Sequence, residues 1–171
     1  MTFTLYALFS AGNGFAATLI VDNNPSHSAD YTTLQDAVDA AAADDTILIG
    51  ASFNQTSYGD AMINKKLFIY GTGYLLQEND FKGGVSKVGK ITFDSDTINT
   101  PSGSIISGVE AGRIDVLIES SEETAIENVR IERNIIWGMN LESIPYTSTP
   151  KVLEIIVSHN KIGQATLYIN N

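Results

Sequence analysis

Short apolar runs, each closed by Gly, Asn or Asp, follow one another along most of the chain. They occupy residues 18–22, 46–50, 66–70 and 90–93, and such runs bounded by turn-forming residues are typical of short β-strands. Apolar and charged residues alternate in 129–132, which would send two side chains inward and two outward. The pattern predicts an all-β protein, because a doubly wound α/β fold would need a helix between successive strands.

One segment near the start has helical periodicity instead. Its apolar face consists of Leu34, Ala37, Val38 and Ala41, at the i, i+3, i+4 and i+7 positions of a helix. Thr33 with Asp36, or Thr32 with Gln35, has the spacing of a capping box. Since this single helix is followed by many strands, we expect it to cover one end of a strand stack.

The second half of the chain repeats itself approximately. Residues 126–136 align with 152–162 at an offset of 26, and 105–109 align with 125–129 at an offset of 20. Offsets of this size match one coil of a β-solenoid, so the chain would hold about four to six coils.

Two asparagines, Asn134 and Asn160, meet in the first of these alignments. Asparagine tolerates left-handed backbone and bonds to nearby main chain, so it suits the tight bends between strands. We therefore interpret Asn134 and Asn160 as structural residues of an asparagine ladder rather than as ligands for a substrate.

A family resemblance rests on three stretches, DYTTLQDAVDAA (30–41), DTILIG (45–50) and MINKKLFIYGTG (62–73). Together they resemble the opening of pectin-lyase-like β-helix proteins, which include pectin esterases and many bacterial surface proteins. The resemblance covers about residues 18–76. It implies a single-stranded, right-handed parallel β-helix with a short N-terminal capping helix, and it is specific for the fold but weak for the activity. The alternative fold is an antiparallel β-sandwich.

The two ends of the chain carry further expectations. An apolar run at 3–9 closes on small residues at 15–17, so 1–17 is expected to be a signal peptide or a disordered arm, although no Lys or Arg precedes Lys65. Residues 18–171 would form the β-helix. Residues 165–171 read as the start of another coil, so we expect a β-helix that is incomplete at its C-terminus, with an open coil able to stack on further repeats or another chain.

Composition narrows the possible partners. With 20 acidic and 10 basic side chains, the net charge is −10, which disfavours nucleic acid as a partner. The chain has no cysteine and two histidines, which leaves little for a zinc site. The apolar run at 3–9 is too short to span a bilayer, so no transmembrane span is expected.

Candidate sites are few. Trp137 and Tyr146 are candidates for stacking on sugar rings, and Trp137 is expected to project from a loop. Asp94 and Asp96 are candidate ligands for calcium, an optional cofactor here because two carboxylates alone are too few for a site.

These observations favour a secreted or cell-surface β-helix module, non-catalytic on its own, that serves as a scaffold, in adhesion or in binding polysaccharide. No Gly-His-Gly motif occurs, although polygalacturonase-like relatives carry one on their active coils. The alternative is the N-terminal part of a polysaccharide lyase, hydrolase or esterase with active coils downstream.

Overall fold

A computed structural model describes residues 15–73, 84–95, 98–118, 125–143 and 153–169. Most of them lie in two parallel sheets. Sheet A contains β1 (Thr18–Val21), β2 (Thr46–Ile49), β4 (Phe68–Tyr70), β6 (Ile105–Ser107), β8 (Ile126–Glu132) and β10 (Leu153–Ser158). Sheet B contains β3 (Ala61–Ile63), β5 (Ser86–Asp94), β7 (Val109–Ile118), β9 (Ile135–Ser143) and β11 (Lys161–Ile169).

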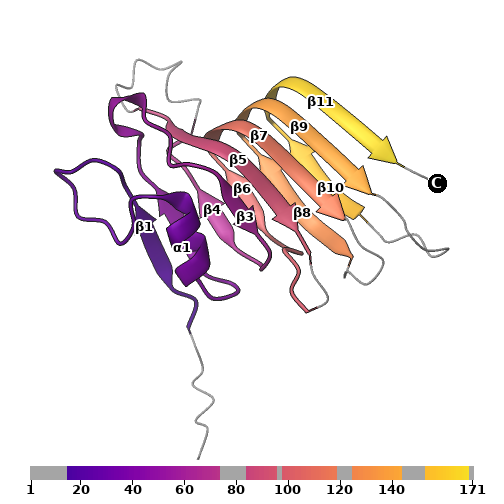
Figure 1. The fold of residues 1–171 in the computed structure, drawn as a ribbon, viewed down its shortest axis with the longest axis horizontal. Helices are drawn as coiled ribbons and strands as arrows, with labels where there is room; N and C mark the ends of the chain where they lie inside the picture. Colours follow the sequence, from indigo (N-terminus) through magenta and orange to yellow (C-terminus); the bar gives the residue numbers. More distant parts are fainter. Residues whose placement is uncertain (1–14, 74–83, 96–97, 119–124, 144–152, 170–171) are drawn as a thin grey trace, which may run out of the picture.

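The first two strands, β1 and β2, both lie in sheet A, with a helix between them. From β2 onward the chain alternates between the two sheets, so each pair of successive strands makes one coil. Sheet A has the order β1-β2-β4-β6-β8-β10 and sheet B the order β11-β9-β7-β5-β3. All strand pairs are parallel, and the coils stack into a β-solenoid of about 5 turns (Figure 1). The predicted parallel β-helix is confirmed, and the antiparallel sandwich is excluded for these strands.

The strand register confirms one predicted repeat and corrects the other. Val129 pairs with Ile155, as the offset of 26 predicts, whereas Ile126 pairs with Leu153 and not with Val152, because the register shifts between Leu153 and Ile155. By contrast, Ile106 pairs with Ile131, an offset of 25, so the alignment of 105–109 with 125–129 was wrong by five residues. That segment was too short, and its apolar spacing too common, to exclude an out-of-phase match.

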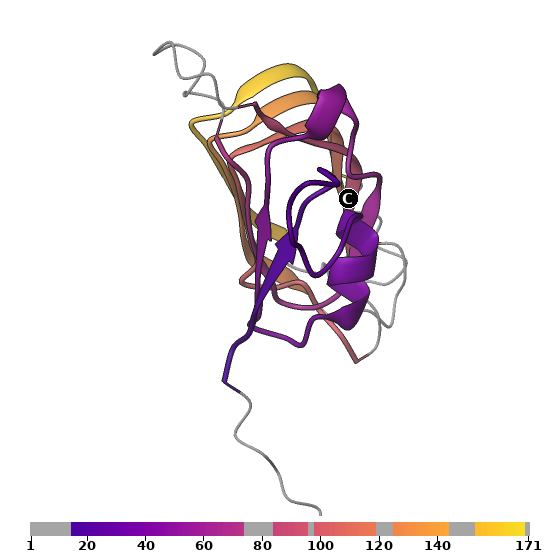
Figure 2. The ribbon, with the colours of Figure 1, turned by 90° about the vertical axis from the view of Figure 1, so that its left-hand side faces the viewer.

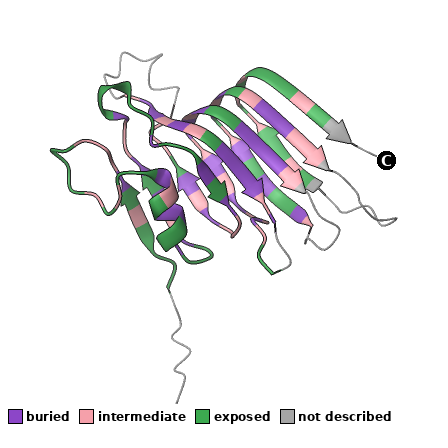
Figure 3. Cartoon of the chain, in the orientation of Figure 1, coloured by how far each residue is buried: buried purple, intermediate pink, exposed green. Residues whose placement is uncertain are grey.

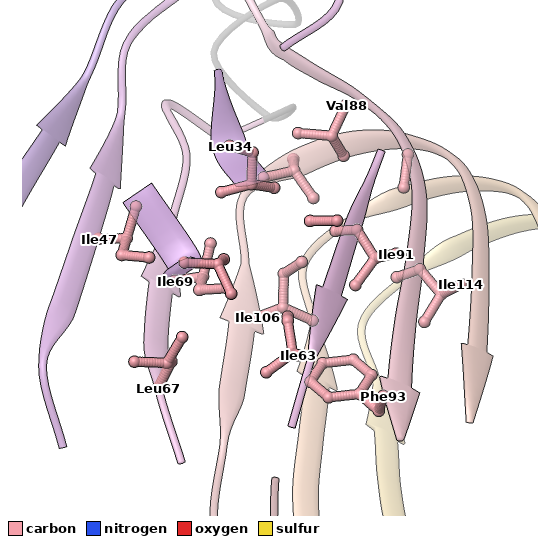
Figure 4. Close-up of a cluster of buried hydrophobic side chains, with 14 of the residues drawn as sticks. Leu34, Ile47, Ile63, Leu67, Ile69, Val88, Ile91, Phe93, Ile106 and Ile114 are labelled. Carbon is pink, nitrogen blue, oxygen red and sulfur yellow. The ribbon is translucent and has the colours of Figure 1, made fainter. Parts of the chain in front are cut away.

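Inward-facing apolar side chains of both sheets fill the solenoid. On sheet A, an isoleucine column runs through paired positions of neighbouring strands, comprising Ile47, Ile69, Ile106 and Ile131, all of them buried. Ile63, Ile91, Phe93 and Ile114 face it from sheet B (Figure 4). Burying one such side chain contributes roughly 1.5–3 kcal/mol, so this core is the main source of stability.

The helix α1 (Leu34–Ala40) covers the N-terminal end of the core (Figure 2). Leu34, Ala37 and Val38 are its buried residues. Thr33 is the N-cap: its Oγ1 accepts a hydrogen bond from the backbone N–H of Asp36 at 3.3 Å and donates one to Asp36 Oδ2 at 2.6 Å. The helix therefore begins with the Thr33–Asp36 pair.

A lysine from a later segment closes the other end of α1. Lys65 Nζ donates hydrogen bonds to the carbonyls of Val38 at 3.0 Å and Ala41 at 2.8 Å. These carbonyls have no partner inside the helix, and they lie at the negative end of its dipole. Lys65 thereby ties α1 to the coil beneath it.

At the opposite end of the described chain, the last coil is more open. Figure 3 shows exposed and half-buried residues along β10 and β11, whereas the earlier strands of both sheets contain buried residues. Val157 is 37% exposed although its partner Ile131 in β8 is fully buried, and Leu167 is 61% exposed.

One corner of the solenoid is built from left-handed residues. Gly108, Arg133 and His159 have φ values of 78°, 57° and 55°, and each separates a sheet A strand from the following sheet B strand. Asn134 and Asn160 come directly after the last two. Asn134 Oδ1 accepts from Val109 N at 3.0 Å, and Asn134 Nδ2 donates to Ile106 O at 3.1 Å.

Asn160 repeats this arrangement one coil later. Its Oδ1 accepts from the backbone N–H of Asn134 at 2.8 Å, and its Nδ2 donates to Ile131 O at 2.6 Å. Each amide thus bonds to the main chain of the preceding coil, not to the side chain of the other asparagine.

Candidate functional site

A pocket of about 240 Å³ opens on the side of the solenoid where β7, β9 and β11 begin. Its lining combines one aromatic ring, two charged side chains and an apolar floor. The lining residues are Trp137, Glu110, Lys161, Ile135, Ile136, Ile162 and Gly163.

Trp137 is the most exposed hydrophobic side chain of this pocket, at 64%. It lies within β9, so the expectation that it sits in a loop was wrong. Its ring is oriented by Glu110, because Trp137 Nε1 donates to Glu110 Oε1 at 3.3 Å. Gly163 lies beside it on β11, and a Cβ there would be 2.9 Å from Trp137 O. The missing side chain therefore lets β11 approach the Trp137 backbone closely, and Gly163 also lines the pocket.

The charged residues of the pocket lie on one line across sheet B. Lys87, Glu110, Ile135 and Lys161 occupy paired positions on β5, β7, β9 and β11. Lys87 Nζ is 3.8 Å from Glu110 Oε1, whereas the exposed side chain of Lys161 has no hydrogen-bond or ion-pair partner among the described residues. Since neighbouring strands are about 4.8 Å apart, Glu110 and Lys161 flank Ile135 at backbone positions roughly 10 Å from each other.

This arrangement offers three kinds of contact at one place. The indole and the isoleucines present an apolar surface, the Glu110 carboxylate accepts hydrogen bonds, and the Lys161 ammonium donates them. Pyranose rings have an apolar face of C–H groups and a rim of hydroxyls, so they match an aromatic wall beside polar side chains.

The sequence pointed to Trp137 but missed Glu110 and Lys161. Neither is unusual by itself, and only the register places them beside the tryptophan. The offsets of 25 and 26 that relate 110, 135 and 161 were the signal that could have identified them. The out-of-phase alignment at offset 20 hid it.

The other site predictions stay untested. Tyr146 and Asp96 lie outside the described residues, and Asp94 lies at the end of β5, half-buried. Within the described part of the chain, no group of three or more His, Asp or Glu side chains could hold a metal ion. Calcium binding by Asp94 therefore stays a prediction.

Tyr58, another aromatic residue, belongs to the hydrophobic core. It is 1% exposed, and its hydroxyl donates to the carbonyl of Ala51 at 3.2 Å. Burial raises the pKa of the Tyr58 hydroxyl above its ordinary 10.0, and the negative charge of Asp22 adds to the rise. Tyr58 therefore has no surface for sugar stacking.

No protein-family model matches the chain, and neither the curated proteins nor the solved structures give a match. The fold alone therefore defines the class of protein, a parallel β-solenoid with one short helix near its N-terminus. Among the described residues, no helix has the length and apolar character needed to cross a membrane.

Proposed function

We propose that this protein is an exported, non-catalytic β-helix module of the pectin-lyase-like type, secreted or held at the cell surface, that binds saccharide in the Trp137 pocket. The observation that carries the proposal is an exposed indole, oriented by Glu110 and bordered by an open pocket. The parallel solenoid with its N-terminal helix supports the family assignment, and the apolar run at 3–9 supports export.

Rigid presentation favours binding. Trp137 lies within a strand paired on both sides, and its Nε1 is already held by Glu110, so little side-chain freedom is lost when a ligand stacks on the ring. An aromatic contact contributes about 0.5–1.5 kcal/mol beyond the area that it buries. With a volume of about 240 Å³, the pocket suits one sugar ring better than an extended chain.

The chain has one tryptophan, so fluorescence excited selectively at tryptophan reports on this pocket alone. We expect a change in emission when a bound saccharide covers the indole, measured by titration with mono- and oligosaccharides. Trp137→Ala is expected to weaken binding at least 10-fold by calorimetry, a loss of about 1.4 kcal/mol.

Tyr70→Ala is the matched control. Tyr70 is another exposed aromatic, at 37%, but it lies on sheet A. The Tyr70→Ala variant should bind saccharide as tightly as the unmodified protein does. Equal losses in the two variants, or binding that survives Trp137→Ala, would place the saccharide elsewhere and contradict the proposal.

A further inference from the structure

Ala17 is the residue at which the described chain enters the fold. Its backbone N–H donates to Asp45 Oδ1 at 2.6 Å, and its carbonyl accepts from Thr46 N at 2.8 Å. Phe15 and Ala16, which precede it, make no hydrogen bond to the other described residues, and Phe15 is 94% exposed. Among the described residues, the hydrogen bonds that join the N-terminal segment to the solenoid therefore begin at the nitrogen of Ala17.

The acceptor of that hydrogen bond is a buried carboxylate. Asp45 is 5% exposed, and its second oxygen, Oδ2, accepts from Ala42 N at 2.8 Å. Among the described residues, no cationic side chain lies within 4.0 Å of the Asp45 carboxylate. The nearby Lys66 pairs instead with Asp44, at 2.6 Å. Buried carboxylates are normally paired with a positive charge, so Asp45 lacks the usual partner while Ala17 carries only an amide.

The sequence places a processing site at the same residue. Signal peptidases require small residues one and three positions before the bond that they cleave. Gly14 and Ala16 meet this rule for the bond between Ala16 and Ala17, whereas cleavage one bond later would put the bulky Phe15 three positions before it. Ala16 and Ala17 are both exposed.

We propose that a signal peptidase hydrolyses the Ala16–Ala17 bond and that the new α-ammonium group of Ala17 forms an ion pair with Asp45. Water adds across the peptide bond: its C–N bond breaks, Ala16 leaves as a carboxylate, and the freed nitrogen of Ala17 takes up a proton at neutral pH. The inference rests on the export in the proposed function, and it moves the end of the leader from residue 17 to residue 16.

Intact-mass analysis of the exported protein tests the cleavage. The full chain is expressed in a bacterium that exports it, and the mature protein is isolated from the medium or envelope. The expected mass is that of residues 17–171. A mature protein that begins at Thr18 or any other residue overturns the inference but leaves export standing. An exported chain that keeps residues 1–16 also overturns the cleavage alone, and a chain that stays in the cytoplasm with residues 1–16 attached overturns both cleavage and export. Saccharide binding is measured separately through Trp137.

Thermal unfolding across pH tests the ion pair in the mature protein. The pKa of an α-amino group is about 7.7–8.0 in an unfolded chain, and pairing with Asp45 raises it in the folded one. The stabilisation is thus complete below the unfolded value and is lost as pH rises through the folded value. We expect Tm to be constant from pH 6 to 7.5 and to fall towards pH 9.5, and Nα-acetylation to remove this fall.

Two adjacent aspartates supply the matched variants. Asp45→Asn should lower Tm by roughly 5–10 °C at pH 7 and abolish the fall towards pH 9.5, because it removes the buried partner. Asp44→Asn should leave both nearly unchanged, since Asp44 is exposed and pairs with Lys66. A fall in Tm that persists after Nα-acetylation or in Asp45→Asn would show that the α-ammonium of Ala17 is not the group responsible.

Discussion

Replacing Asn134 by alanine should destabilise the solenoid far more than a surface substitution would. The Asn134 side chain is fully buried and provides the acceptor for Val109 N–H, which is itself in a 1% exposed residue. Without Asn134 Oδ1 that N–H is left buried and unsatisfied, at a cost of about 1–3 kcal/mol. Loss of the hydrogen bond to Ile106 O adds about 0.5–1.5 kcal/mol. We therefore expect a decrease of roughly 2–4 kcal/mol in the free energy of unfolding.

The same substitution at Asn160 is the internal control. Asn160 makes equivalent bonds to Asn134 N and Ile131 O, but it lies on the open last coil and is only half-buried. Water can reach the groups that Asn160→Ala uncovers, so the expected loss is about 0.5–1.5 kcal/mol.

Urea unfolding followed by circular dichroism measures both losses. The m-value should stay constant across the variants, so that midpoint shifts report stability. If burial determines what each asparagine contributes, Asn134→Ala must lower the free energy of unfolding clearly more than Asn160→Ala does. Equal losses within about 0.5 kcal/mol, or a greater loss at Asn160, would refute the reasoning.

Two further perturbations test the core and the corner. The pKa of the Tyr58 hydroxyl is raised in the folded state, so the stability that the neutral hydroxyl contributes is complete below pH 10 and is lost as pH rises above that value. Tyr58→Phe should therefore reduce the alkaline fall in Tm, measured from pH 9 to 11. Gly108→Ala should cost roughly 2–4 kcal/mol in urea unfolding, because φ is 78° and the new Cβ would lie 2.8 Å from the Gly71 carbonyl oxygen. Gly138→Ala is its control, with only ordinary contacts at 3.6 Å or more and a negative φ, and a similar loss there would contradict the role of the left-handed corner.

Sequence periodicity predicted those parts of the fold that depend on local rules. The core was visible because strand alternation buries Val129 and Ile131 and exposes Arg130 between them. The start of the helix was visible because capping needs only Thr33 and a nearby acidic residue. Both features are decided within a few residues of chain.

The candidate site depends on longer distances and was only partly visible. Trp137 was expected in a loop because it falls in the insertion between the two aligned repeats, one residue before Gly138. In the solenoid, Gly138 continues β9 beside Arg113 of β7. The partners of Trp137, Glu110 and Lys161, could be identified only with the correct coil length, which short apolar motifs do not determine.

The exclusive pairing of neighbouring coils has a consequence for how the chain acquires its structure. Residues paired between adjacent strands are separated by only 22 residues, as for Thr46 and Phe68, to 37 residues, as for Ile69 and Ile106. The entropy lost in closing each loop grows slowly with loop length, so every coil faces a similar kinetic barrier, however far along the chain it lies. Because α1 and β1 come first, a polypeptide that emerges N-terminus first presents a finished template before the next coil is available. Folding can then proceed directionally, with each completed coil serving as the nucleus for the one that follows.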